Sequence, residues 1–155
     1  MTTQIEVRGI TNEEVLRLLQ ILNLPIDSYA VCGGALLAHH GLRLNTNDVD
    51  LLVTPELYQR LLTQWKARSQ SRPDCPAIEI DGVRVEAFAS INFTDSDKAL
   101  EYIERHQLGM TTGIPLVRLE DMLEWKRLIL RENPRCKRAR EHQRDIDLLE
   151  KAVMR

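Results

Sequence analysis

The stretch DVDLLV, residues 48–53, constrains the fold of this chain more than any other segment. Its last three residues are apolar, which indicates a buried β-strand, yet Asp48 and Asp50 flank a single valine at its start. Residues two apart on a strand point to the same face, about 6.6 Å apart along it. Two carboxylates this close repel each other unless a cation lies between them. The pair therefore predicts a magnesium site, with a solvated strand end as the alternative.

A glycine pair stands upstream of this strand. Gly33 and Gly34 follow the apolar strand predicted for residues 28–32 and precede a short helix predicted for residues 35–40. Exposed backbone N–H groups at such a turn attract anions, and no side chain blocks a phosphate there. The glycine pair therefore indicates either a phosphate-binding turn or a tight connection between a strand and a helix.

A further acidic residue lies on a later strand. In VRVEAF, residues 83–88, Glu86 shares one face with Arg84 and Phe88, although a hydrophobic residue is the expectation there. The Asp81-Gly82 pair before this strand predicts a two-residue hairpin turn. We interpret Glu86 as a third metal ligand or an edge charge, and Glu79 on the preceding strand is its rival.

Helices and strands alternate along the 155 residues, which indicates an α/β or α+β fold in a single domain, residues 1–155. The expected strands are 28–32, 48–53, 77–80, 83–88 and an extended piece at 113–117. The expected helices begin after the caps Thr11, Thr54 and Thr94 or cover residues 35–40, about 119–131 and about 135–153. A sheet-containing core of about 1–112 and a C-terminal helical segment of about 113–155 follow from this order.

Composition excludes several classes of protein. The formal net charge of −2 gives no overall reason to expect nucleic acid or a membrane surface as a partner. The three cysteines, Cys32, Cys75 and Cys136, lack the spacing of a zinc site or a disulfide framework, so we expect reduced thiols. The sequence shows no signal-peptide pattern and no run of roughly 18 apolar residues. We therefore expect a cytoplasmic protein.

The order of these motifs resembles the DNA-polymerase-β-like nucleotidyltransferase superfamily: a glycine pair, a helix, D-x-D at the start of an apolar strand and a lone acid on a later strand. The stretch 33–53 is similar to small bacterial members, the minimal nucleotidyltransferases and the nucleotidyltransferase toxins of abortive-infection systems. The residues that match the motif around the paired acids are Arg43, Thr46, Asp48 and Asp50. Lys126 matches the family's L-x-x-x-K helix loosely, and the resemblance covers roughly residues 28–150.

This resemblance implies a small mixed sheet flanked by helices, with a C-terminal helical segment. It also implies transfer of a nucleoside monophosphate from an NTP to an acceptor hydroxyl, with release of pyrophosphate. Asp48 and Asp50 would bridge two cations, Mg²⁺ or Mn²⁺, and Glu86 would complete the ion that activates the acceptor. The implied nucleotide-binding residues are Gly33, Gly34, Arg43, Thr46 and Lys126.

The sequence leaves the acceptor open among a small molecule, a tRNA and a protein, and it does not indicate an oligomeric state. The basic stretch Arg135–Arg144 is either a solvated helix face or an RNA contact. His142 and Asp145 lie where relatives carry other groups. The alternative function is a non-catalytic binding module with the nucleotidyltransferase fold, such as a toxin–antitoxin component; an RNA-binding protein acting through the basic tail is a third.

Overall fold

One mixed sheet runs through the chain in the computed structural model, which describes residues 11–43, 46–67, 75–90, 95–109 and 113–154. The described helices are α1 (Asn12–Leu22), the 3-10 helix η1 (Ile26–Ser28), α2 (Gly33–His39), α3 (Pro55–Gln64), α4 (Ser96–Glu104), α5 (Leu119–Glu132) and α6 (Ala139–Val153). The described strands are β1 (Tyr29–Cys32), β2 (Asp48–Val53), β3 (Lys66–Ala67), β4 (Pro76–Ile80), β5 (Val83–Phe88), β6 (Gln107–Leu108) and β7 (Pro115–Leu116).

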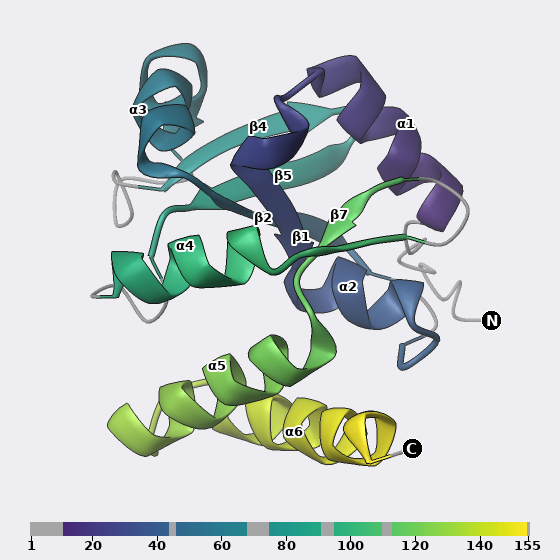
Figure 1. Cartoon of the computed structure of the whole chain (residues 1–155), viewed down its shortest axis with the longest axis vertical. Coiled ribbons are helices and arrows are strands. Elements are labelled where there is room, and N and C mark those ends of the chain that lie inside the picture. The colour runs from purple at the N-terminus through teal and green to yellow at the C-terminus, as the bar shows by residue number, and fades with distance from the viewer. Residues whose placement is uncertain (1–10, 44–45, 68–74, 91–94, 110–112, 155) are drawn as a thin grey trace, which may run out of the picture.

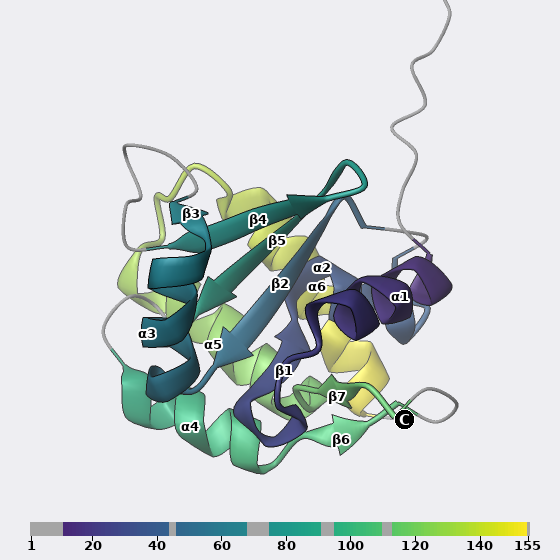
Figure 2. The same ribbon diagram turned by 90° about the horizontal axis from the view of Figure 1, so that it is seen from above.

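The strands are ordered β3-β4-β5-β2-β1-β7-β6. β2 runs parallel to β5 and antiparallel to β1, which in turn runs parallel to β7. Figures 1 and 2 show α1 and α3 over one face of the sheet and α5 and α6 against the other. The predicted mixed α/β architecture with flanking helices is confirmed. None of the described helices is both long and apolar enough to cross a membrane.

Most predicted element boundaries rest on local chemistry that the structure confirms. The Thr11 hydroxyl accepts a hydrogen bond from the backbone N–H of Glu14, so it caps α1 as the capping-box pattern predicts. Asp81 and Gly82 both have positive φ, 51° and 80°, as the two-residue turn between β4 and β5 requires.

Two predicted helix starts are wrong. The N-cap of α4 is Asp95, whose carboxylate accepts a hydrogen bond from the backbone N–H of Lys98 at 2.8 Å, and Thr94 lies outside the described residues. The last helix begins at Ala139 rather than near residue 135. Two successive turns precede it, in which the N–H groups of Cys136 and Ala139 bond to carbonyls three residues earlier.

Alternation along β2 and β5 divides their side chains between two environments. Val49, Leu51, Val85 and Ala87 have no exposed surface and belong to the hydrophobic core. The residues between them, including the acidic ones, point to the opposite face, toward α5 and α6. The sheet therefore presents its acidic residues to the helical C-terminal segment.

Candidate functional site

The register between β2 and β5 places the three predicted acids on one face. Asp50 is aligned with Glu86, and Asp48 is aligned with Arg84, on neighbouring parallel strands. Neighbouring strands lie about 4.8 Å apart, so these backbone positions are adjacent. Glu79 lies on β4, one strand further from β2, and is exposed. The structure therefore favours Glu86, which is 2% exposed, over its rival as a partner of Asp50.

Gly33 allows the Asp50 carboxylate to lie against the backbone of the turn into α2. A Cβ atom at Gly33 would stand only 2.6 Å from Oδ2 of Asp50, a distance that real Cβ atoms do not show. Gly33 also has a φ of 64°, a conformation that L side chains rarely adopt. The glycine turn thus faces Asp50, and any side chain at Gly33 would be strained and would displace this carboxylate.

The acids share a face without forming a ready-made metal cage. Within the described ranges, no three His, Cys, Asp or Glu side chains are grouped so as to hold an ion. The donor chemistry fits a hard divalent cation, since Asp48, Asp50 and Glu86 offer only carboxylate oxygens. The register places their backbone positions next to one another on two neighbouring strands. Metal binding by these residues stays a prediction.

Gly34, Arg43 and Thr46 pack together beside the paired acids. A Cβ atom at Gly34 would stand 2.7 Å from Oγ1 of Thr46 and 3.0 Å from Nη1 of Arg43. The Thr46 hydroxyl donates a hydrogen bond to the backbone carbonyl of Asp48 at 2.9 Å. These contacts hold the start of β2 against α2.

A buried carboxylate on α6 connects two of the predicted nucleotide-binding residues. Arg43 Nη2 donates to both carboxylate oxygens of Asp145, at 2.7 and 2.9 Å, and Lys126 Nζ lies 3.1 Å from Oδ2. Lys126 Nζ also lies 3.0 Å from Nδ1 of His142. We call Arg43, Lys126, His142 and Asp145 the Asp145 network. It joins the loop before β2 to α5 and α6.

Asp145 is a functional residue that no sequence motif identified. A signal was present, because Asp145 shares the buried face of α6 with Ile146 and Leu149, and its side chain is only 4% exposed. A buried charge requires partners. An aspartate on the apolar face of a helix therefore predicts cations elsewhere in the chain, although not which ones.

Electrostatics fix the protonation of two side chains here. Burial, together with the cations of Lys126 and Arg138, lowers the pKa of His142 to about 4, so its imidazole is neutral at pH 7. The neutral Nδ1 then accepts a hydrogen bond from Lys126, and Nε2 carries the proton. Burial and the nearby Asp50 charge raise the pKa of Cys32 well above its usual value, so this thiol stays protonated.

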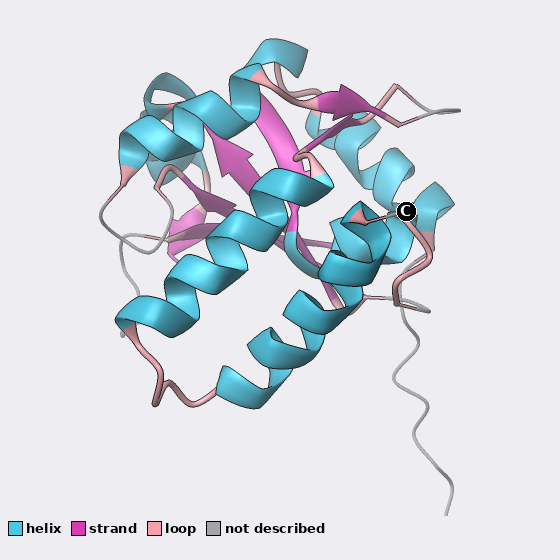
Figure 3. Cartoon of the chain, turned by 60° about the horizontal axis from the view of Figure 1, so that its bottom comes forward, coloured by secondary structure: helices cyan, strands magenta, loops and turns pink. Residues whose placement is uncertain are grey.

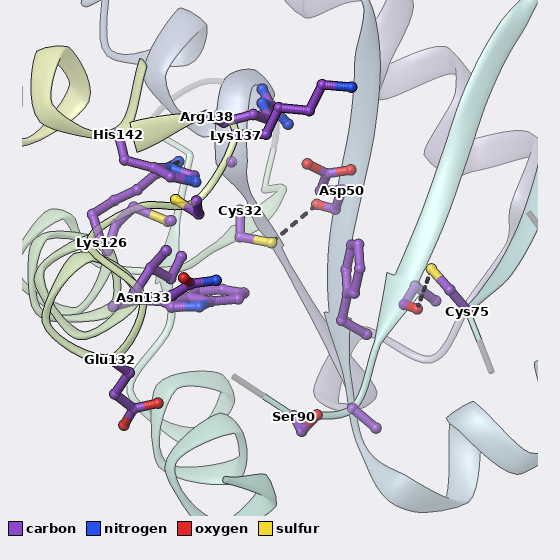
Figure 4. Close-up of a pocket in the computed structure, with 18 of the residues that line it drawn as sticks. Cys32, Asp50, Cys75, Ser90, Lys126, Glu132, Asn133, Lys137, Arg138 and His142 are labelled. Atoms are coloured by element: carbon purple, nitrogen blue, oxygen red, sulfur yellow. Dashed lines mark hydrogen bonds between the residues drawn. The ribbon is translucent and has the colours of Figure 1, made fainter. Parts of the chain in front are cut away.

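A cavity of about 770 Å³ lies between the acidic face of the sheet and the helical segment. Gly33 and Asp50 line it from the sheet side, and Lys126, His142, Lys137 and Arg138 line it from the other. Figure 4 shows Lys137 and Arg138 close to Asp50. Figure 3 shows α5 and α6 side by side, and the loop that joins them supplies these two cations. The cavity can thus hold an anion beside a carboxylate that suits a metal ion.

All predicted site residues are described, but only Gly33, Asp50 and Lys126 line this cavity. The structure adds Lys137, Arg138 and His142, all within the basic stretch Arg135–Arg144. The three free cysteines also line the cavity, although they are far apart in the sequence.

Comparisons with known proteins agree with this arrangement at the level of the fold. No protein-family model and no curated protein matches the chain. A candidate nucleotidyltransferase from Thermotoga maritima is similar in structure, with a TM-score of 0.54 and 21% identity over 84% of this chain and 96% of its own. An antigenic nucleotidyltransferase-like protein from Paracoccidioides brasiliensis has a TM-score of 0.49 and 20% identity over 92% of this chain and 78% of its own. The first of these similarities shows that the chain has a nucleotidyltransferase-like fold.

Proposed function

We propose that this chain is a metal-dependent nucleotidyltransferase, which moves a nucleoside monophosphate from an NTP to an acceptor hydroxyl and releases pyrophosphate. The observation that supports this most is the close approach of Asp50 to Gly33 on the wall of a cavity that Lys126 and Arg138 also line. A bare glycine, a carboxylate and several cations in one cavity match the needs of a metal-bound triphosphate.

Asp48, Asp50 and Glu86 would hold Mg²⁺ or Mn²⁺, and the ions, when bound, would stabilise charge on the attacking and leaving oxygens. Lys126 binds a phosphate oxygen of the NTP, since the side chain lines the cavity and is held in place by Asp145. Arg138 and Lys137 neutralise the charge that develops on the departing pyrophosphate.

Three of the expected nucleotide-binding residues would act through other groups. Arg43 holds Asp145, which positions Lys126. Thr46 fixes the Asp48 peptide, and Gly34 lets the loop that carries Thr46 approach α2. In this proposal, substituting Arg43 or Thr46 changes the alignment of the site without removing a direct contact to the nucleotide.

The test is the Asp50→Asn variant, assayed with labelled NTPs and magnesium for pyrophosphate release. All four NTPs are offered with an acceptor panel of small molecules, tRNA and protein. We expect the wild type to consume one or more NTPs and the variant to lose at least 100-fold in rate, on the order of one lost electrostatic contact in an active site. The exposed Asp27→Asn serves as the matched control and should retain full activity.

A second candidate, a non-catalytic module such as a toxin–antitoxin component, is favoured by one observation. No three potential ligands are grouped to hold an ion among the residues that the structure describes. If wild type and Asp50→Asn are equally inert across the panel, and calorimetry detects no magnesium-dependent nucleotide binding, this second function replaces the first.

RNA is one candidate acceptor. Lys137 and Arg138 line the cavity, and Arg135, Arg140 and Arg144 are exposed on the same stretch. An RNA acceptor held by these residues would bind less tightly as salt rises. A small-molecule acceptor would show a much weaker dependence, so the salt dependence of the Michaelis constant distinguishes the two classes.

A further inference from the structure

The cavity continues beyond Asp50 to a part with a different chemistry. Phe88 of β5 lines it from the sheet side, and Met122, Trp125 and Ile129 of α5 line it from the helical side. Figure 4 shows Arg138, Lys137 and Asp50 at one end and Ser90 and Glu132 at the other. One continuous cavity therefore has a cationic end and an end with apolar and aromatic walls. We call the second part the apolar end.

The aromatic side chains of the apolar end are packed against other buried parts of the protein. Trp125 is 8% exposed, and its ring lies 6.4 Å from the ring of Tyr102, tilted by 40°. Tyr102 is itself fully buried, and its hydroxyl donates a hydrogen bond to Glu124 at 2.8 Å. Phe88 stands on β5 at the position aligned with the fully buried Leu52. These side chains form a preorganised apolar surface.

The two ends together restrict the ligand. A volume of about 770 Å³ lies within the range of small-molecule sites, roughly 300–1,000 Å³. A ligand that fills both ends has an anionic group at one side and a flat, apolar group at the other. Nucleoside triphosphates meet this description, since the triphosphate is anionic and the nucleobase is flat and largely apolar. Because Glu132 lines the cavity at the apolar end, a triphosphate is repelled there and belongs at Lys126 and Arg138.

We propose that the apolar end is the nucleobase subsite, in which the base of the NTP stacks on Trp125 and contacts Phe88. This inference rests on the proposed function, because it takes an NTP as the occupant. Ser90 and Asn133 line the same cavity and supply hydrogen-bonding groups for the edge of the base. Stacking tolerates every base, so the subsite contributes affinity for all four NTPs.

The chain has two tryptophans, which makes the subsite observable. The Trp65→Phe variant leaves Trp125 as the single tryptophan of the full chain. Titration with each NTP and magnesium should quench its fluorescence, because the base stacks on the indole. Inorganic tripolyphosphate should bind by calorimetry and compete with the NTP, yet leave the fluorescence unchanged.

A matched pair of substitutions measures the contribution of stacking. Trp125→Leu should weaken NTP binding by about 5- to 150-fold and leave tripolyphosphate affinity unchanged. Trp65→Leu is the control, because Trp65 is buried to a similar extent, 9% exposed, and does not line the cavity. If Trp125→Leu does not fold, Phe88→Leu provides the measurement, since Phe88 is only half-buried.

The outcomes separate this inference from the proposed function. The nucleobase subsite is overturned if NTPs bind no more tightly than tripolyphosphate and leave Trp125 fluorescence unchanged. That result leaves the triphosphate site, and the apolar end would then belong to the acceptor. If neither NTP nor tripolyphosphate binds, the proposed function fails together with the subsite.

Discussion

Replacement of Gly33 by alanine tests whether the glycine turn and Asp50 act as one unit. The added methyl group would stand 2.6 Å from Oδ2 of Asp50, whereas ordinary contact begins at 3.4 Å. The carboxylate must therefore move by about 0.8 Å or change its rotamer. A displacement of about 1 Å in an active site reduces the rate by roughly 100-fold. We expect Gly33→Ala to lose pyrophosphate release on that scale.

Gly41 offers a control that separates backbone strain from the contact with Asp50. Its φ of 73° is as unfavourable for alanine as the 64° of Gly33, but nothing lies within 4 Å of a Cβ atom there. The left-handed conformation costs about 1–2 kcal/mol for a residue with a Cβ atom. Gly41→Ala should thus lower the free energy of unfolding by that amount alone. Gly33→Ala should lower it by about 1 kcal/mol more, on the order of one forced off-rotamer side chain.

Both variants are compared with the wild type by urea denaturation followed by circular dichroism and by the pyrophosphate assay. We expect Gly41→Ala to keep wild-type turnover despite its lower stability. Equal loss of stability in the two variants, together with unchanged turnover in Gly33→Ala, would refute the coupling between the turn and Asp50. Equal loss of turnover in both would assign the effect to general destabilisation.

Two further predictions concern the Asp145 network. Asp145→Asn should lower the free energy of unfolding by about 2–4 kcal/mol, because the cations of Arg43 and Lys126 lose a partner that is only 4% exposed. Urea denaturation measures this loss. A loss no larger than that caused by Asp147→Asn, at an exposed position on the same helix, would contradict the prediction. The second prediction concerns His142, whose pKa is lowered to about 4 by burial and by the Lys126 charge. As the pH falls, this histidine is therefore protonated in the unfolded chain at a higher pH than in the folded chain. The free energy of unfolding should therefore fall by about 1–2 kcal/mol as the pH drops from 6.5 to 4, a value that allows for solvent screening at this half-exposed site. The His142→Asn variant should show a smaller fall. An identical pH profile in the variant and the wild type would contradict the role of His142.

The acidic half of the site was predictable because its determinants are local. Alternation along a strand places Asp48 and Asp50 on one face, and the same rule separates Glu86 from Val85 and Ala87. The structure confirms this division through the alignment of Asp50 with Glu86 and the complete burial of Val85 and Ala87. The choice of Glu86 over Glu79 required the strand order, which the sequence alone does not provide.

The cationic half was not predictable in the same way. Arg43 and Asp145 are 102 residues apart, and no local pattern identifies them as partners. Lys137 and Arg138 looked like members of a solvated helix face, since the last helix was expected to begin near residue 135. Because turns precede Ala139 instead, these two residues lie in a loop that lines the cavity. A shift of one helix start thus changes the interpretation of the basic stretch.

The two halves meet through a single buried side chain. Asp145 holds Lys126, which lines the cavity, and Arg43, which packs beside Gly34 and Thr46. Thr46 in turn bonds to the backbone of Asp48, at the start of the strand that carries the paired acids. The separation between the carboxylates and the cavity's lysine therefore depends on a chain of contacts through Asp145. The two ion pairs of Asp145 and the hydrogen bond of Thr46 are 2.7–3.1 Å long, and Arg43 is joined to Thr46 by packing against Gly34. Loss of the Asp145 carboxylate should therefore misalign the acids and the lysine even where the fold survives.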